Sequence, residues 1–172
     1  MNISYILCTQ GTALFMANGL LVAVMTMGRP RNRPTKSNFT FQHRLCHDLE
    51  SLIWVVTYAM MIHHRNLLAA TDPEMCEEYK ETVDECWEGH VYSNIRRSHN
   101  DMILTGTDPD SESLVSLYFP DPREAAFFCD AMRLLANRPL LGTRITYEGL
   151  CTLFKKHIQL AKEPQDIDVV SK

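Results

Sequence analysis

The side chains best suited to chemistry in this sequence are its histidines and cysteines. His43 and His47 are four residues apart, a spacing that places two imidazoles on one face of a helix, and Cys46 lies beside His47. The glutamate of an H-E-x-x-H zinc motif is missing, however. Cys151 and His157 are close in sequence, but nothing pairs them as nucleophile and base. We therefore predict no metal site and no catalytic residue of this kind.

Composition narrows the class of protein. The 172 residues are 45% hydrophobic and 22% charged, as in one ordinary globular domain. The net charge is −4, whereas nucleic-acid-binding proteins usually carry an excess of Lys and Arg. We therefore expect no nucleic-acid partner. The six cysteines are scattered without a C-x-x-C pair, which indicates reduced thiols in an intracellular, cytoplasmic protein rather than a zinc site.

The longest predicted element is a helix over 45–68. Its apolar residues cover nearly every face: Leu49, Leu52, Ile53, Val55, Val56, Ala59, Met60 and Ile62. A helix that is apolar on all sides is typical of the core of a soluble protein. Only about eleven residues of this helix are uninterrupted, fewer than the ~20 predominantly apolar residues that a bilayer requires. We therefore predict a buried core helix.

Two Asp-Pro pairs predict helix starts, since Asp is a favoured N-cap and Pro suits the first helical position. Asp72 and Pro73 open a helix to about residue 87 with an acidic, solvated face. Asp121 and Pro122 open another that ends near 137–139. Its predicted buried face is Ala125, Phe128, Met132 and Leu135.

The remaining elements are shorter. We predict a helix or two broken helical turns over 12–27, a loop over 28–39, and a helix over 90–104. We predict a loop over 106–113, because these residues are rich in Gly, Pro, Asp and Ser. For 114–119 we predict a strand or one helical turn. A last helix begins near Thr146, with a buried stripe of Leu150, Leu153, Phe154, His157 and Ile158.

The first 28 residues carry no charged side chain and precede the basic segment 29–33. Such a pattern is shared by membrane anchors with a basic flank. Polar residues and glycines interrupt the stretch, including Asn2, Gln10, Asn18 and Gly19. We therefore expect a buried helix here and keep membrane anchoring as the weaker alternative.

Two motifs in this order carry a family resemblance. The first is Gly11-Thr12-x-x-Phe15-Met16-Ala17-x-x-Leu20, and the second is His47-Asp48-Leu49-Glu50-Ser51-Leu52-Ile53-Trp54-Val55. Together they resemble the fungal-type protein kinase family. The resemblance implies that the first motif ends an activation segment and that the second opens the long central helix of the C-terminal lobe.

The intact family uses ATP and Mg²⁺ to phosphorylate Ser and Thr side chains. The groups that hold the nucleotide and metal are missing from this sequence: there is no G-x-G-x-x-G and no D-F-G, and 43–45 reads H-R-L in place of H-R-D. The resemblance thus implies a mainly α fragment of a C-terminal lobe, without N-lobe or catalytic loop. We expect this partial kinase domain over 1–162 and a polar tail over 163–172, with no cofactor for the chain itself.

Two further residues gain a role from the resemblance. The kinase counterpart of Asp48 accepts N–H bonds from the catalytic loop; alternatively, Asp48 only complements the dipole of its own helix. Arg144 resembles the arginine that pairs with the glutamate of A-P-E. That glutamate would fall near Gly19, where it is absent. If the kinase arrangement persists, 12–27 docks beside the start of the last helix.

Three hypotheses remain open. The first is a catalytically incomplete, pseudokinase-like C-lobe fragment. The second is a helical protein-interaction module without enzymatic activity, and the third is a small membrane-anchored helical protein. Because the central helix is apolar on all sides, the first two predict protein partners and self-association through exposed core surface.

Overall fold

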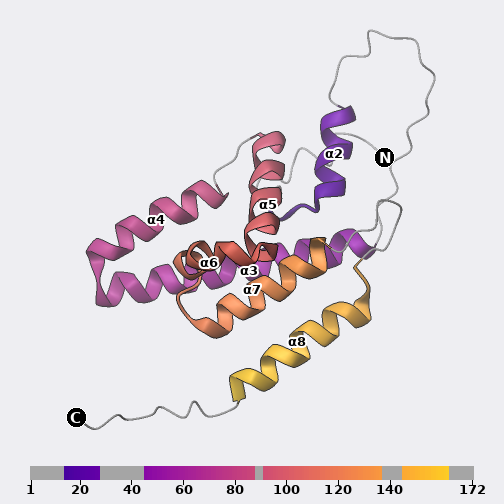
Figure 1. The fold of residues 1–172 in the computed structure, drawn as a ribbon. Helices are drawn as coiled ribbons and strands as arrows, with labels where there is room; N and C mark the ends of the chain where they lie inside the picture. The colour runs from indigo at the N-terminus through magenta and orange to yellow at the C-terminus, as the bar shows by residue number, and fades with distance from the viewer. Residues whose placement is uncertain (1–13, 28–44, 88–90, 137–144, 163–172) are drawn as a thin grey trace, which may run out of the picture.

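The structure is a computed structural model that describes residues 14–27, 45–87, 91–136 and 145–162 (Figure 1). Within these ranges it contains helices and no strand, which confirms the prediction of a mainly α fold. The helices are α2 (Asn18–Met27), α3 (Leu45–Thr71), α4 (Pro73–Trp87), α5 (Tyr92–Thr107), the short 3₁₀ helix η2 (Pro109–Ser111), α6 (Glu112–Tyr118), α7 (Pro122–Ala136) and α8 (Tyr147–Lys162).

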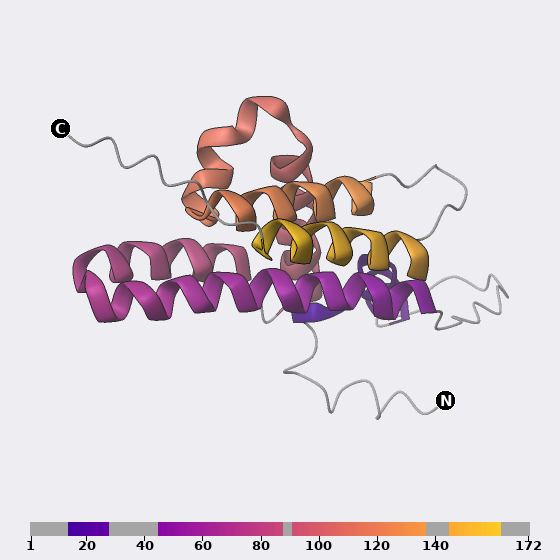
Figure 2. The same ribbon diagram turned by 90° about the horizontal axis from the view of Figure 1, so that it is seen from below.

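Helix α3 forms the long axis of the molecule. Helix α4 folds back alongside it, and α5 follows beyond the end of α4 and points in a different direction from α3, as the ribbon shows (Figures 1 and 2). Helix α7 packs on α5 and α3, and α8 packs on α7. The predicted long helix over 45–68 is therefore confirmed, with three more residues at its end.

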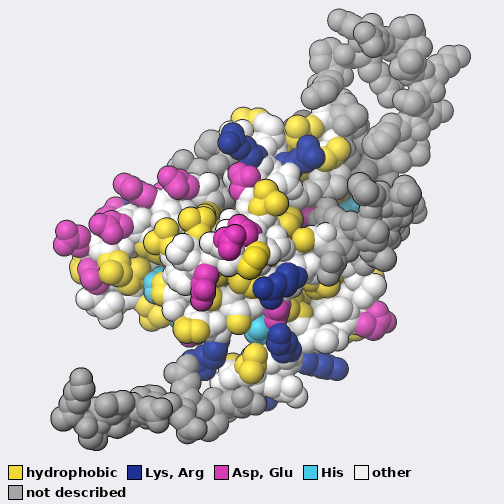
Figure 3. Space-filling model, viewed as in Figure 1, with side chains coloured by type: hydrophobic (Ala, Val, Ile, Leu, Met, Phe, Trp, Pro, Cys, Tyr) yellow, Lys and Arg dark blue, Asp and Glu magenta, His cyan; other side chains and the backbone are white. Residues whose placement is uncertain are grey.

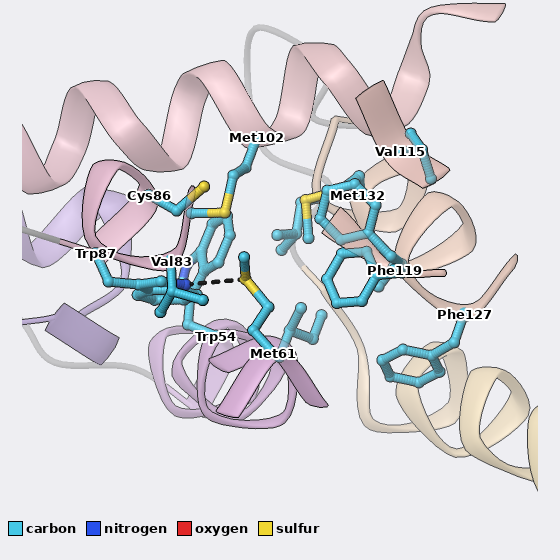
Figure 4. Close-up of a cluster of buried hydrophobic side chains, with 14 of the residues drawn as sticks. Trp54, Met61, Val83, Cys86, Trp87, Met102, Val115, Phe119, Phe127 and Met132 are labelled. Carbon is cyan, nitrogen blue, oxygen red and sulfur yellow. Dashed lines mark hydrogen bonds between the residues drawn. The ribbon is translucent and has the colours of Figure 1, made fainter. Parts of the chain in front are cut away.

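The core lies where α3, α4, α5, α6 and α7 meet (Figure 4). Trp54, Phe128 and Met132 are fully buried there. The indole N–H of Trp87 donates to the sulfur of Met61, 3.2 Å away. The one polar group of this buried side chain therefore has a hydrogen-bond partner inside the core. The predicted face of α7 is confirmed for Phe128, Met132 and Leu135, whereas Ala125 is only half-buried; Phe127 and Ala131 are buried in addition.

The helix starts follow the local signals in the sequence. The Asp72 carboxylate accepts the backbone N–H of Met75 at 3.1 Å, and the Thr146 hydroxyl accepts that of Gly149 at 3.0 Å. Asp121 caps α7 in the same manner. Because each cap needs only residues within one turn, sequence alone located it. The acidic side chains of α4 form a solvated surface, visible at the left of Figure 3.

The prediction of a loop over 106–113 is wrong. Gly106 and Thr107 complete α5, and the next residues form η2 and the start of α6. The Asp108 carboxylate accepts the N–H of Asp110 and the hydroxyl of Ser111, so it caps η2. Residues such as Asp and Ser are common both in loops and at helix N-termini. In this segment Asp108 caps a helix. Of the two alternatives for 114–119, the helical turn is correct.

Two predictions of burial need correction. The long helix is not enclosed on every side, because Leu52 and Val55 of α3 are 43% and 41% exposed. Ile158, predicted in the buried stripe of α8, is 53% exposed. Periodicity shows which faces are apolar, but the number of neighbouring elements decides which of those faces is covered. Here α8 contacts the bundle mainly through α7.

Among the described residues, α3 is the one helix long and apolar enough to cross a membrane. Length and composition alone give this result, and core helices of soluble proteins meet the same criterion. In α3 the side chains of Ile53, Trp54 and Met61 are completely buried against the bundle.

Candidate functional site

The two sequence motifs meet in space through a buried hydrogen bond. The backbone N–H of Asn18 donates to Oε1 of Glu50 at 2.9 Å, and the two residues are only 6% and 4% exposed. Asn18 is the first residue of α2, so its N–H lacks a partner within that helix. A carboxylate also complements the positive end of the helix dipole. Glu50 of α3 therefore anchors the start of α2.

The next two contacts extend this junction. The side-chain amide of Asn18 donates to Oδ1 of Asn100 at 3.1 Å, which ties α2 to α5. At Gly19, an added Cβ would lie 3.2 Å from Nε2 of His47. The missing side chain lets the imidazole of α3 pack directly on α2.

His99 of α5 holds the segment that precedes α2. Its Nε2 lies 2.9 Å from the carbonyl oxygen of Leu14, which can only accept, so this nitrogen carries the proton. The ring stacks on Trp54 with centroids 3.9 Å apart and planes 13° from parallel. Phe15 packs against Tyr58 and Trp87, with ring centroids 5.3 and 6.0 Å away.

Most predicted motif residues that the structure describes lie at or near this junction. Phe15, His47 and Glu50 take part directly, and Met16 packs nearby with Leu21. The other predicted positions are distributed as follows: Asp48 is exposed in the first turn of α3, Ser51 is half-buried, and Gly11, Thr12 and Arg144 lie outside the described residues.

The expected docking of 12–27 beside the last helix is not what the structure shows. Helix α2 packs on α5, and it lies well apart from α8 (Figure 1). Gly19 is the second residue of α2 rather than an interior one, and it faces His47. The position of α2 is set by the residues that hydrogen-bond to its first residue, Asn18. These are Glu50 of α3 and Asn100 of α5.

Sequence reasoning missed the contribution of α5. Ile95, His99, Met102 and Gly106 are buried and follow a helical spacing of three or four residues. A histidine within such a stripe is a signal of a buried polar contact. Its partner, a backbone carbonyl, leaves no trace in the sequence.

In chemical terms the junction is a clamp. The Glu50 carboxylate faces a backbone N–H, and the His99 imidazole faces a carbonyl, so the two groups hold chain segments together. Over the described residues no group of three or more His, Cys, Asp or Glu side chains is arranged to hold a metal ion.

A second polar cluster joins α7 and α8. Oδ2 of Asp130 lies 2.5 Å from Nζ of Lys156 and 3.0 Å from Nε2 of His157, and Oδ1 lies 3.2 Å from Arg133. Burial alone would raise the pKa of Asp130, but the hydrogen bonds from Lys156 and His157 outweigh it and lower that pKa. This cluster fastens α8 to the bundle.

An open pocket of about 500 Å³ lies between α6 and α7. Val115 and Phe119 contribute apolar walls, and Asp108, Glu112 and Arg133 contribute charge. Asp108 is engaged as the cap of η2 and Arg133 with Asp130, whereas Glu112 is exposed in the first turn of α6. Burial raises the pKa of the Cys129 thiol in its lining, which disfavours the reactive thiolate.

No family model, no curated protein and no solved structure matches this chain.

Proposed function

We propose that these residues form the helical part of a fungal-type-kinase-like C-terminal lobe that carries no phosphoryl-transfer chemistry itself. One observation supports this above all: the hydrogen bond from Asn18 to Glu50 joins the two resembling motifs. The resemblance implies that the first motif ends an activation segment and that the second opens the central helix, and this hydrogen bond is a direct contact between the two segments.

The role we propose for the chain is to bind another polypeptide. Phosphoryl transfer depends on positioned metal ions and charged groups around the phosphates, and the sequence offers none of the motifs that provide them. The carboxylate at the junction is already engaged with a backbone N–H. ATP and Mg²⁺ thus belong to the intact family and not to this chain.

A helical interaction module unrelated to kinases is the second candidate. It is favoured by the apolar side chains that α3 leaves exposed, above all Leu45, Leu52 and Val55. Exposed apolar patches are typical of protein-binding surfaces. The two candidates share the binding role and differ in ancestry.

A nucleotide titration tests the absence of catalysis. We expect no change in melting temperature with ATP–Mg²⁺ and no phosphate transfer to protein substrates. Binding to the folded state at 100 times Kd would stabilise by ~2.7 kcal/mol. A saturable rise in melting temperature would contradict the proposal.

Co-expression separates the two candidates. The probe is the front portion of a fungal-type kinase, comprising its N-lobe and catalytic loop. A kinase-like lobe should co-purify with this portion, and Glu50→Ala should weaken the complex by loosening α2. Failure to co-purify, with the chain itself folded by circular dichroism, would favour the unrelated interaction module.

A further inference from the structure

The outer face of α3 carries a regular apolar seam. Its residues recur at alternating spacings of three and four: Leu45, Asp48, Leu52, Val55, Ala59, Ile62, Asn66 and Ala69. Ile62 is half-buried at the edge of the seam, partly packed against the main core, and the other seven are exposed. This is the spacing by which one helix packs along another. The seam lies opposite the face that places Ile53, Thr57 and Met61 in the core.

The seam is placed to accept a second helix. Figure 2 shows α3 at the lower margin of the helices, with α4 next to it and α5, α6, α7 and α8 all on its upper side. The four central positions, Leu52 to Ile62, contain no charge, and one polar residue lies beyond each end. A partner must therefore offer an apolar centre flanked by polar groups.

We propose that this partner is a second copy of the chain, with the two α3 helices antiparallel. The proposal rests on the binding role given above and names the partner. In a register centred on Thr57, Leu52 meets Ile62 of the other copy and Val55 meets Ala59. The same register sets the Asp48 carboxylate opposite the Asn66 amide, a donor that it can accept from. Apolar groups thus meet apolar groups, and polar groups meet polar groups.

Charge selects the antiparallel orientation. A parallel pair would place the two Asp48 carboxylates opposite each other, and like charges in facing positions repel. The antiparallel pair keeps them at opposite ends of the seam. A surface that matches itself after a two-fold rotation is what a closed dimer requires.

Sedimentation velocity over a range of concentrations is the test. The wild-type chain should pass from monomer to dimer as concentration rises. Leu52→Glu and Val55→Glu should each weaken the dimer by ~10-fold or more, because a carboxylate would be desolvated against apolar partners. Leu117→Glu on α6, also at an exposed leucine, is the matched control and should leave the dimer unchanged.

Charge variants test the register. Asn66→Asp should weaken the dimer by setting carboxylates opposite each other, and Asp48→Asn should restore it in the double variant. Asp48→Asn alone should change affinity little. A clear strengthening by Asp48→Asn alone would indicate parallel helices and overturn the proposed orientation.

Other outcomes overturn the dimer itself. These are a monomer at every soluble concentration, an assembly equally weakened by Leu117→Glu, or aggregation that Leu52→Glu does not alter. Flotation with phosphatidylcholine vesicles covers the lipid alternative: flotation lost in Leu52→Glu would make the seam a membrane contact. None of these results bears on the nucleotide titration, so the two proposals fail separately.

Discussion

At the scale of single residues, Glu50 makes the most consequential contact. Glu50→Ala would leave the buried N–H of Asn18 without its acceptor, which costs about 1–3 kcal/mol. Urea denaturation measures the loss. Glu50→Gln keeps an acceptor oxygen and should lose less. Glu81→Ala on the exposed face of α4 is the control, with an effect within ~0.5 kcal/mol. Equal losses at positions 50 and 81 would refute the clamp.

Asp130 gives a prediction about pH. The pKa of Asp130 in the folded protein lies below its ordinary value of 3.8. The Asp130 carboxylate therefore contributes its full share to the free energy of unfolding at pH values above 3.8. The contribution is lost as pH falls through the folded-state pKa, where the carboxyl is protonated. Asp130→Asn should therefore cost roughly 1–2 kcal/mol at neutral pH and almost nothing in acid, measured by denaturation at several pH values.

Lys156→Met tests the cause of that pH dependence. It removes one of the two side chains whose hydrogen bonds lower the pKa of Asp130. Its stability deficit should shrink with acid in the same direction as that of Asp130→Asn. A deficit in Asp130→Asn that stays constant down to pH 2 would show that the carboxylate charge is not what fastens α8.

At the scale of elements, α5 and α7 approach each other closely at Gly106. A Cβ on Gly106 would lie 2.5 Å from Cγ of Met132 and 3.0 Å from the Phe128 ring. Alanine improves helix propensity by about 1 kcal/mol, but overpacking of a tight core costs about 1–3 kcal/mol. Because the clash involves Cβ of Met132 as well, we expect net destabilisation in Gly106→Ala, seen as a lower melting temperature. Leu104→Ala, on the exposed side of α5, should have little effect.

At the scale of the whole molecule, cohesion is uneven. The main core joins α3 to α8, whereas α2 contributes Leu21 to a small separate cluster with Ile95. Segments with few buried apolar contacts open locally at low cost. Native-state hydrogen exchange should therefore find the α2 amides least protected among the described helices. Leu21→Ala should lower their protection more than that of α7. Exchange of α2 only through global unfolding would contradict this.

Much of the architecture follows from the sequence because its causes are local. Asp72 and Asp121 cap helices that begin at the very next residue, and the spacing of Phe128, Met132 and Leu135 fixes the inner face of α7. The length of α3 likewise follows from an unbroken run of helix-compatible residues. Each of these features depends on partners within a turn or two.

Only the tertiary structure determined the junction and the seam. Glu50 and Asn18 are 32 positions apart, and His99 and Leu14 are 85 apart, so no local pattern pairs them. The sequence showed that α3 is apolar on all sides, but not that Leu52 and Val55 would stay exposed. The physical reason is that hydrophobicity belongs to a residue, whereas burial depends on which distant elements pack against it.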